Sequence, residues 1–193
     1  MTDETPADHG PSHDRVSVLI IEDEPDLAEM YAAYLPEEYE TAIADGGEAG
    51  LERLDDGYDV VLVDRRMPVM SGNEVLAAIE ERSLDCRVAM VTAVNPDFDI
   101  IDLRIDDYIV KPVTRQELVE TVNRLVKLDE YNERVQELTS KKLKRNVLEV
   151  EKTQAELADN PEFERLNREI ADLEQEVDEL ATELDIEDDG PTA

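Results

Sequence analysis

Short, unbroken runs of aliphatic residues recur through the first two thirds of the chain. Runs without polar alternation are typical of strands buried on both faces, as in a parallel sheet. Between the runs, apolar residues return at spacings of three and four, which indicates helices. The pattern predicts five strands, over 16–21, 39–44, 59–63, 88–91 and 108–110. It predicts helices over 25–35 and 46–54, one after residue 72, a short one around 97–103, and a last one capped by Thr114.

Regular alternation of strands and helices restricts the topology. Under the right-handed crossover rule, it predicts an α/β fold in which a five-stranded parallel sheet is doubly wound by helices on both faces. Glu117, three residues after Thr114, completes a capping-box pattern at the start of the last helix. That helix is expected to run on without a break, because its apolar spacing continues as far as Leu138. Ser140 then interrupts the register, and a displaced apolar stripe follows at Leu143, Val147, Val150 and Leu157.

A second long helix is expected after the turn Asp159-Asn160-Pro161. Its apolar residues follow a heptad pattern, the signature of helices that pack side by side. We expect the side chains of this seam to be buried: Phe163, Leu166, Ile170, Leu173, Val177, Leu180 and Leu184.

Two arrangements of this C-terminal segment are open, an α-helical hairpin and an intermolecular coiled coil. In a parallel homodimer, glutamates at one flanking position would repel each other unless salt screens them. An antiparallel hairpin instead brings the acidic second helix close to basic residues of the first helix, so charge favours the hairpin. The basic cluster consists of Lys141, Lys142, Lys144 and Arg145. A homodimer through either seam remains open.

Composition narrows the possible partners. The chain has 51 acidic and 19 basic residues among 193, for a formal net charge of −32. Such an excess disfavours general binding to nucleic acid or to an anionic membrane at low salt. It suits a very salty cytoplasm, because at about 1 M salt the Debye length falls to roughly 3 Å. One cysteine, Cys86, excludes an internal disulfide, and no apolar run is long enough to span a membrane. We expect a cytoplasmic protein with no membrane partner.

Polar residues stand where the predicted strands end. Glu22 and Asp23 follow the first strand and Asp64 ends the third. Thr92 ends the fourth strand and Lys111 follows the fifth. Since the carboxyl ends of parallel strands share one edge of the sheet, these side chains should converge. Three carboxylates repel one another, and a hard divalent cation such as Mg²⁺ would relieve that repulsion. The set suits a phosphoryl group carried on Asp64, with Mg²⁺ and Lys111 neutralising its charge.

Five motifs in order resemble the receiver domain of two-component response regulators, which has a flavodoxin-like fold. They are Ile21 to Pro25, Val63-Asp64 with Met67-Pro68 and Ser71-Gly72, Val91 to Ala93, Asp106 to Tyr108, and Lys111-Pro112. The resemblance implies that a sensor histidine kinase phosphorylates Asp64. It also implies a cis peptide bond between Lys111 and Pro112. It assigns the metal to Asp23, Asp64, Glu22 and the backbone carbonyl of Arg66, and the phosphoryl-binding and switch roles to Thr92, Lys111 and Tyr108.

The C-terminal segment resembles the HalX domain, which follows receivers in halophilic archaea. The expected organisation is a disordered leader (1–15), a receiver domain (16–128), a HalX-like module (129–186) and a disordered tail (187–193). The basic cluster is then either a candidate output patch, with DNA as its partner, or serves only to neutralise the acidic helix.

Two other functions are weighed against a phosphorylated signalling switch. One is a phosphorylation-independent coiled-coil scaffold, which the joint presence of Asp64, Thr92 and Lys111 disfavours. The other is an aspartate-type phosphatase, which would need a second acid two residues after Asp64, where Arg66 stands. We therefore expect no enzyme activity beyond self-phosphorylation and slow self-dephosphorylation at Asp64.

Overall fold

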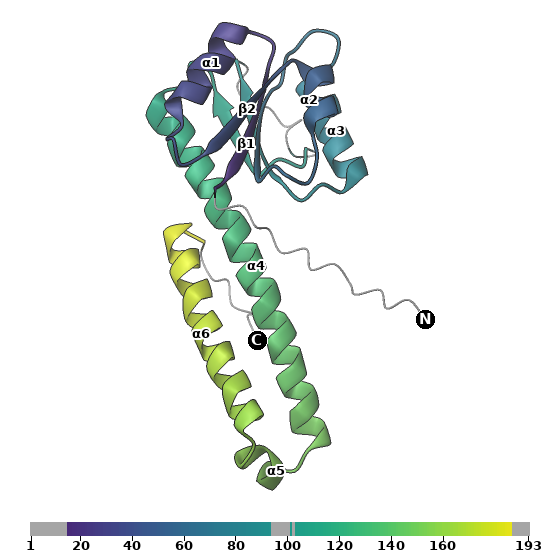
Figure 1. Ribbon diagram of the computed structural model, residues 1–193, viewed down its shortest axis with the longest axis vertical. Coiled ribbons are helices and arrows are strands. Elements are labelled where there is room, and N and C mark those ends of the chain that lie inside the picture. Colours follow the sequence, from purple (N-terminus) through teal and green to yellow (C-terminus); the bar gives the residue numbers. More distant parts are fainter. Residues whose placement is uncertain (1–14, 94–100, 102, 187–193) are drawn as a thin grey trace, which may run out of the picture. The chain divides into compact units, whose positions relative to one another are not determined.

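The computed structural model describes residues 15–93, 101 and 103–186 (Figure 1). The chain divides into two compact units, Met1–Val122 and Asn123–Ala193. The expected leader (all but Arg15) and tail lie outside the described residues, as does most of the helix expected around 97–103.

The first unit is built on one sheet with strand order β2-β1-β3-β4-β5, and every adjacent pair of strands is parallel. The strands are β1 (Ser17–Glu22), β2 (Glu40–Asp45), β3 (Val60–Asp64), β4 (Arg87–Thr92) and β5 (Asp107–Val110). Each lies within about one residue of the predicted range. The doubly wound parallel sheet predicted from the sequence is therefore confirmed.

Helices cover both faces of this sheet. They are α1 (Pro25–Tyr34), α2 (Gly47–Arg53), α3 (Gly72–Arg82) and the beginning of α4 (Arg115–Glu151). Helices α2 and α3 lie on one face, whereas α1 and the first turns of α4 lie on the other (Figure 1). All five residues of β3 are buried, as a strand covered on both faces requires. Side chains on one face of the sheet, such as Leu19 and Val61, share a core with Val75 and Ile79 of α3.

Local sequence fixes where several helices begin. Pro25 occupies the first turn of α1, where its missing N–H is not needed. The Thr114 hydroxyl accepts a hydrogen bond from the Glu117 backbone N–H at 3.2 Å, and the Thr114 backbone N–H donates to the Glu117 carboxylate at 2.9 Å. The capping box predicted at the start of α4 is therefore confirmed.

The second unit is an antiparallel helical hairpin. Its first helix is α4, which continues to Glu151 without interruption at Ser140, and its second is α6 (Pro161–Glu183). The short helix α5 (Gln154–Ala158) joins them and contains Leu157, so Leu157 is not on the same helix as the displaced stripe. Asn160 caps α6 by accepting hydrogen bonds from two backbone N–H groups, which confirms the predicted helix start.

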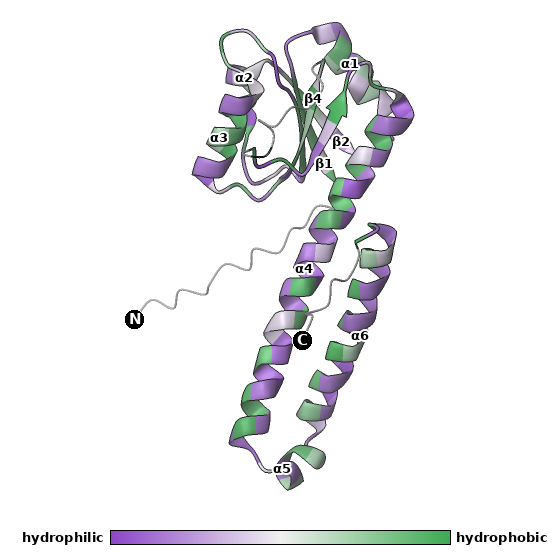
Figure 2. Cartoon of the chain, turned by 180° about the vertical axis from the view of Figure 1, so that it is seen from behind, coloured by the Kyte–Doolittle hydropathy of each residue, from purple (hydrophilic) through white to green (hydrophobic). Residues whose placement is uncertain are grey.

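Apolar packing along the seam holds the hairpin together. Leu138 of α4 packs with Ile170 and Leu173 of α6, and these three side chains are buried. The other seam residues expected to be buried are only half-buried: Phe163, Leu166, Val177, Leu180 and Leu184. The reason is geometric, because two helices alone leave the edges of their shared seam open to solvent. Figure 2 shows hydrophobic and hydrophilic positions alternating along both helices.

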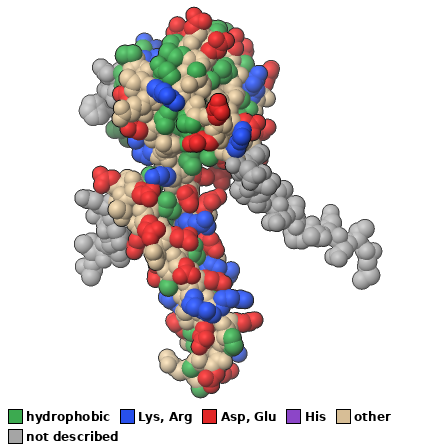
Figure 3. Space-filling view, turned by 60° about the vertical axis from the view of Figure 1, so that its left-hand side comes forward, with side chains coloured by type: hydrophobic (Ala, Val, Ile, Leu, Met, Phe, Trp, Pro, Cys, Tyr) green, Lys and Arg blue, Asp and Glu red, His purple; other side chains and the backbone are tan. Residues whose placement is uncertain are grey.

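Ion pairs flank this seam at intervals of one heptad. Lys127, Arg134 and Lys141 on α4 pair with glutamates on α6, and the Lys141 contact measures 2.9 Å. In the same order, the partners of these three basic residues are Glu183, Glu176 and Glu169. Basic and acidic side chains are accordingly interspersed along the hairpin (Figure 3). Three of the four glutamates that would repel one another in a parallel homodimer are therefore paired with basic residues of the same chain. The hairpin favoured by charge is therefore the arrangement observed.

Candidate functional site

Three carboxylates meet where β1 and β3 end. Glu22 is the last residue of β1 and Asp23 follows it, while Asp64 is the last residue of β3. Strands β1 and β3 are direct neighbours in the sheet, so their ends lie side by side. One carboxylate oxygen from each of the three residues lies within 4.8 Å of the other two. Glu22 and Asp64 are buried and Asp23 is half-buried.

Lys111 contributes the balancing positive charge. It follows β5, and its Nζ lies 2.8 Å from Glu22 Oε2 and 3.2 Å from Asp64 Oδ2. The Lys111 backbone N–H donates to the Thr92 carbonyl at 2.8 Å, which extends the pairing of β5 with β4 by one residue. The peptide bond between Lys111 and Pro112 is cis, as expected. One ammonium group therefore bridges carboxylates from two strands.

Burial and neighbouring charges shift the pKa values of Glu22 and Lys111. Burial raises the pKa of Glu22, and the hydrogen bond and charge of Lys111 offset this only in part. Burial acts to lower the pKa of Lys111, but the hydrogen bond from Lys111 to Glu22 and the charges of Glu22 and Asp64 outweigh it and raise that pKa. Lys111 therefore stays protonated, while Glu22 is more basic than an ordinary glutamate.

The carboxylate cluster has the chemistry of a magnesium site. Carboxylate oxygens are hard ligands of the kind that Mg²⁺ prefers. Glu22 Oε1 is buried and has no hydrogen-bond partner, so a buried acceptor is left unsatisfied. Arg66 is exposed, and its backbone N–H donates to Asp64 Oδ1 at 3.4 Å, which brings the Arg66 backbone close to the acidic cluster. The residues present fit a divalent cation.

The two expected switch residues lie on β4 and β5. Thr92 is the last residue of β4 and is fully buried; its strand neighbour Val91 pairs in register with Asp64. Tyr108 is half-buried in β5 and pairs in register with Met90. Thr92 therefore ends its strand beside the carboxylate cluster, and Tyr108 lies farther back along the sheet.

Sequence reasoning missed two neighbours of the site. Tyr31 of α1 is buried, and burial raises its pKa, with smaller effects from Lys111, Glu22 and Asp64. Gly72 begins α3 so close to the backbone of Asp64 that a Cβ there would collide with the Asp64 carbonyl. The motif Ser71-Gly72 indicated a helix start, but only the tertiary contact explains why the residue is glycine.

The basic cluster lies in the hairpin and is largely engaged there. Lys141 pairs with Glu137 and Glu169, and Lys142 pairs with Glu174 at 2.8 Å. Arg145 approaches Glu149 at 3.9 Å. Within the described residues, Lys144 alone of the four basic side chains makes no ion pair.

The fold and the acidic site together define a receiver-type signalling module of the doubly wound α/β class. The chain belongs to the response regulator receiver domain family, whose model matches residues 18–123. A HalX domain model matches residues 127–190. The resemblance to a receiver followed by a HalX domain is therefore confirmed.

Similar proteins share the receiver part. A Haloferax volcanii protein named "Putative transcriptional regulator" is 52% identical over 110 residues, covering 56% of this chain and 19% of that protein. "Sensory transduction protein RegX3" of Mycobacterium bovis is 37% identical over 116 residues, covering 58% of this chain and 51% of the relative. The chain thus spans about half, or less, of the length of these relatives.

Solved structures agree on the fold. The response regulator TrrA from Thermotoga maritima, determined in complex with Mg²⁺-BeF, is 34% identical with a TM-score of 0.51. The match covers 57% of this chain and 98% of TrrA. A CheY-like receiver domain from Methanospirillum hungatei is 26% identical with a TM-score of 0.53, covering 60% of this chain and 97% of that domain. No helix in the described part of the chain is both long and apolar enough to cross a bilayer.

Proposed function

We propose that this protein is a cytoplasmic two-component response regulator whose Asp64 accepts a phosphoryl group from a sensor histidine kinase. The observation that carries the proposal is the position of Lys111, whose ammonium group lies within 3.2 Å of Asp64 and 2.8 Å of Glu22. A cation held there can neutralise the oxygens of a phosphoryl group on Asp64. Family membership and the Mg²⁺-BeF complex of TrrA support the same reading.

In the phosphoryl transfer to Asp64, one bond to phosphorus forms as another breaks. An Asp64 carboxylate oxygen forms a bond to phosphorus while the bond from phosphorus to the donor breaks, and the donor leaves with that electron pair. Asp23, Glu22, Asp64 and the Arg66 carbonyl would hold Mg²⁺, which when bound neutralises charge on the transferring group. Lys111, whose ammonium group lies 3.2 Å from Asp64 Oδ2, would bind the phosphoryl oxygens, and the Thr92 hydroxyl would donate a hydrogen bond to one of them.

The phosphorylated state would be read by the C-terminal hairpin. In this proposal residues 16–128 form the phosphoacceptor domain and residues 129–186 the output module. Thr92 and Tyr108 would change position when Asp64 is modified, and α4 is continuous from Arg115 into the hairpin. A continuous helix offers a covalent route from one domain to the other. The name of the Haloferax volcanii relative supports transcriptional regulation as the output.

The role of the basic cluster follows from its contacts. Lys141, Lys142 and Arg145 are engaged by glutamates of the hairpin, which supports charge neutralisation over nucleic-acid binding. Changing all four basic residues to Gln separates the roles, with helicity and DNA binding measured across a salt series. Lost helicity without DNA binding in either protein supports neutralisation, whereas sequence-specific binding lost only in the variant supports a DNA-binding output.

A phosphotransfer experiment tests the main proposal. The full chain is treated with an acyl phosphate in the presence of Mg²⁺, and the intact mass is measured. We expect one added phosphoryl group in the wild type and none in Asp64→Asn, with unchanged circular dichroism. Full phosphorylation of Asp64→Asn would refute the assignment. Absence of phosphorylation in the wild type, with either the small donor or a kinase, would favour the scaffold alternative.

A further inference from the structure

The hairpin has a second apolar surface on α4, separate from its seam with α6. Leu143, Val147 and Val150 are 60%, 60% and 83% exposed. Their spacing of four and then three residues places them on one face of the helix. Here these three residues are called the outer stripe. A contiguous exposed apolar row on a chain this acidic marks a surface that another apolar surface covers.

Two charged residues beside the outer stripe differ from the neighbouring charged residues in having no ion-pair partner in the described part of the chain. Eight charged residues lie between Glu137 and Lys152 of the sequence, both ends included. Among the described residues, six of them have an ion-pair partner, and the two without one are Lys144 and Glu151. Lys144 and Glu151 are seven positions apart in the sequence, so they share one face of the helix, two turns apart. That face borders the outer stripe.

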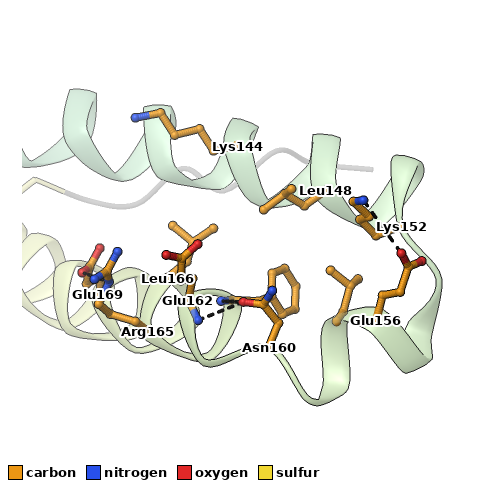
Figure 4. Close-up of a pocket in the computed structure, with 11 residues that line it drawn as sticks. Lys144, Leu148, Lys152, Glu156, Asn160, Glu162, Arg165, Leu166 and Glu169 are labelled. Carbon is orange, nitrogen blue, oxygen red and sulfur yellow. Dashed lines mark hydrogen bonds and ion pairs between the residues drawn. The ribbon is translucent and has the colours of Figure 1, made fainter.

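Lys144 lines a pocket of the hairpin together with Glu162 and Glu169 but forms no ion pair with either carboxylate. In Figure 4 its side chain lies along α4, apart from the labelled carboxylates Glu162 and Glu169 of α6. Lys152, the residue after the end of α4, pairs with Glu156 of α5. Lys144 and Glu151 therefore remain as one positive and one negative charge beside an exposed apolar row.

We propose that the outer stripe is the docking surface for a second copy of this chain, packed antiparallel about a two-fold axis close to Val147. In that register Val147 meets Val147 of the partner subunit, and Leu143 meets Val150 of the partner subunit. Lys144 then faces Glu151 of the partner subunit, because flanking positions of the same kind face each other in an antiparallel pair. The two-fold symmetry repeats this ion pair, so both unpartnered charges of each chain are satisfied.

A parallel pairing through the same stripe lacks this complementarity. It would place Thr139 and Asn146 of one copy opposite Lys144 and Glu151 of the other. Those neutral side chains leave all four charges unpaired. Charge complementarity therefore selects the antiparallel pairing.

The size of the surface and the net charge set the strength of the association. Three aliphatic side chains cover less than the roughly 800 Å² per partner of a standard interface, so the dimer is weak and reversible. Two chains of formal charge −32 repel each other at low salt. Because salt screens that repulsion without weakening apolar contacts, the dimer strengthens as salt rises.

Sedimentation velocity of the full chain in about 0.1 M and 3 M salt, over a concentration series, tests the association. We expect a monomer–dimer equilibrium that shifts to dimer at high salt. Val147→Asp should abolish it while helicity is retained. Lys152→Gln is the matched control, because Lys152 follows the end of α4 and its charge is already paired with Glu156, and it should leave the equilibrium unchanged.

Charge exchange tests the register. Lys144→Glu or Glu151→Lys alone should raise the dimer dissociation constant about tenfold, because two attractions become repulsions. The double variant should restore it, and so should an equimolar mixture of the two single variants. Restoration in both cases is specific to the antiparallel pairing. Failure of both to restore the dimer would overturn the register.

Disulfide trapping gives an independent geometric readout. In a Cys86→Ser background, Val147→Cys should crosslink to itself across the two-fold axis. Leu143→Cys should not, because the offset of about eight residues separates the two copies by roughly 12 Å. Equal crosslinking at both positions would indicate the parallel pairing instead. A protein that stays monomeric under all these conditions would overturn the proposal. The outer stripe would then be covered by a terminal segment of the same chain or by a different protein.

Discussion

Gly72 lies against the backbone of Asp64, and a Cβ at position 72 would collide with the Asp64 carbonyl oxygen. The Gly72 backbone N–H donates to the carbonyl of the next residue, Arg65, at 3.1 Å. The first turn of α3 is therefore held directly against the end of β3. This contact links the start of a helix to the position of the proposed phosphoacceptor.

Gly72→Ala should accordingly destabilise the receiver and slow its phosphorylation. The added methyl group meets rigid backbone, and forced overpacking of this kind costs about 1–3 kcal/mol. Urea unfolding gives the free energy, and intact-mass kinetics give the phosphorylation rate. Gly57→Ala is the control, because its nearest neighbour is the side-chain oxygen of Asp55, which can move. Equal effects of the two substitutions would contradict the role of the Gly72 contact.

Of the two acidic residues at the end of β1, Asp23, which follows the strand, should contribute more to metal binding than Glu22, its last residue. Asp23→Ala should weaken Mg²⁺ binding by at least about tenfold, because it removes a proposed direct ligand. Glu22→Ala should weaken it less, since Glu22 already accepts a hydrogen bond from Lys111 and its contact with the metal is expected to be indirect. Titration calorimetry without any phosphodonor measures this directly. Small and equal effects would mean that the cation is held elsewhere.

Packing should stabilise the hairpin more than any of its ion pairs. Leu173 is 7% exposed, and Leu173→Asp removes its packing and buries a charge, for a loss of more than about 3 kcal/mol. Lys142→Gln removes one exposed pair and should cost about 0–1 kcal/mol. Urea unfolding followed by circular dichroism compares them, and both proteins should gain stability at molar salt. A larger loss in Lys142→Gln than in Leu173→Asp would show that charge, and not packing, holds the hairpin.

The contact between Lys142 and Glu174 should depend on pH. The hydrogen bond and charge of Lys142 lower the pKa of Glu174. A carboxylate whose pKa is lower when folded stabilises the protein above its unfolded pKa and loses this effect as pH falls through the folded pKa. A double-mutant cycle with Lys142→Gln and Glu174→Gln should therefore show coupling at pH 7 that is lost as pH falls through the lowered pKa of Glu174. Glu179→Gln paired with Lys142→Gln is the non-contacting control, and coupling that persists at low pH would contradict the ion pair.

The sheet and the placement of its polar residues could be predicted from the order of residues along the chain. Unbroken aliphatic runs require strands covered on both faces, and alternation with helices requires parallel strands. Once the strands are parallel, residues at their carboxyl ends must share an edge. That is why Glu22, Asp64 and Lys111 were expected to converge before any distance was known. The heptad pattern after Pro161 likewise predicted a helix with one apolar face.

Which side chains are in contact could not be predicted from the residue pattern and is seen in the folded chain. Lys111 and Glu22 are 89 residues apart, and local pattern carries no information about whether their side chains meet. The same holds for the collision that excludes a side chain at Gly72 and for the partners of the heptad glutamates. In the outer stripe, the sequence showed the apolar residues but not that Lys144 and Glu151 remain unpaired. Contacts of this kind depend on distances between remote segments, which exist only after the chain has folded.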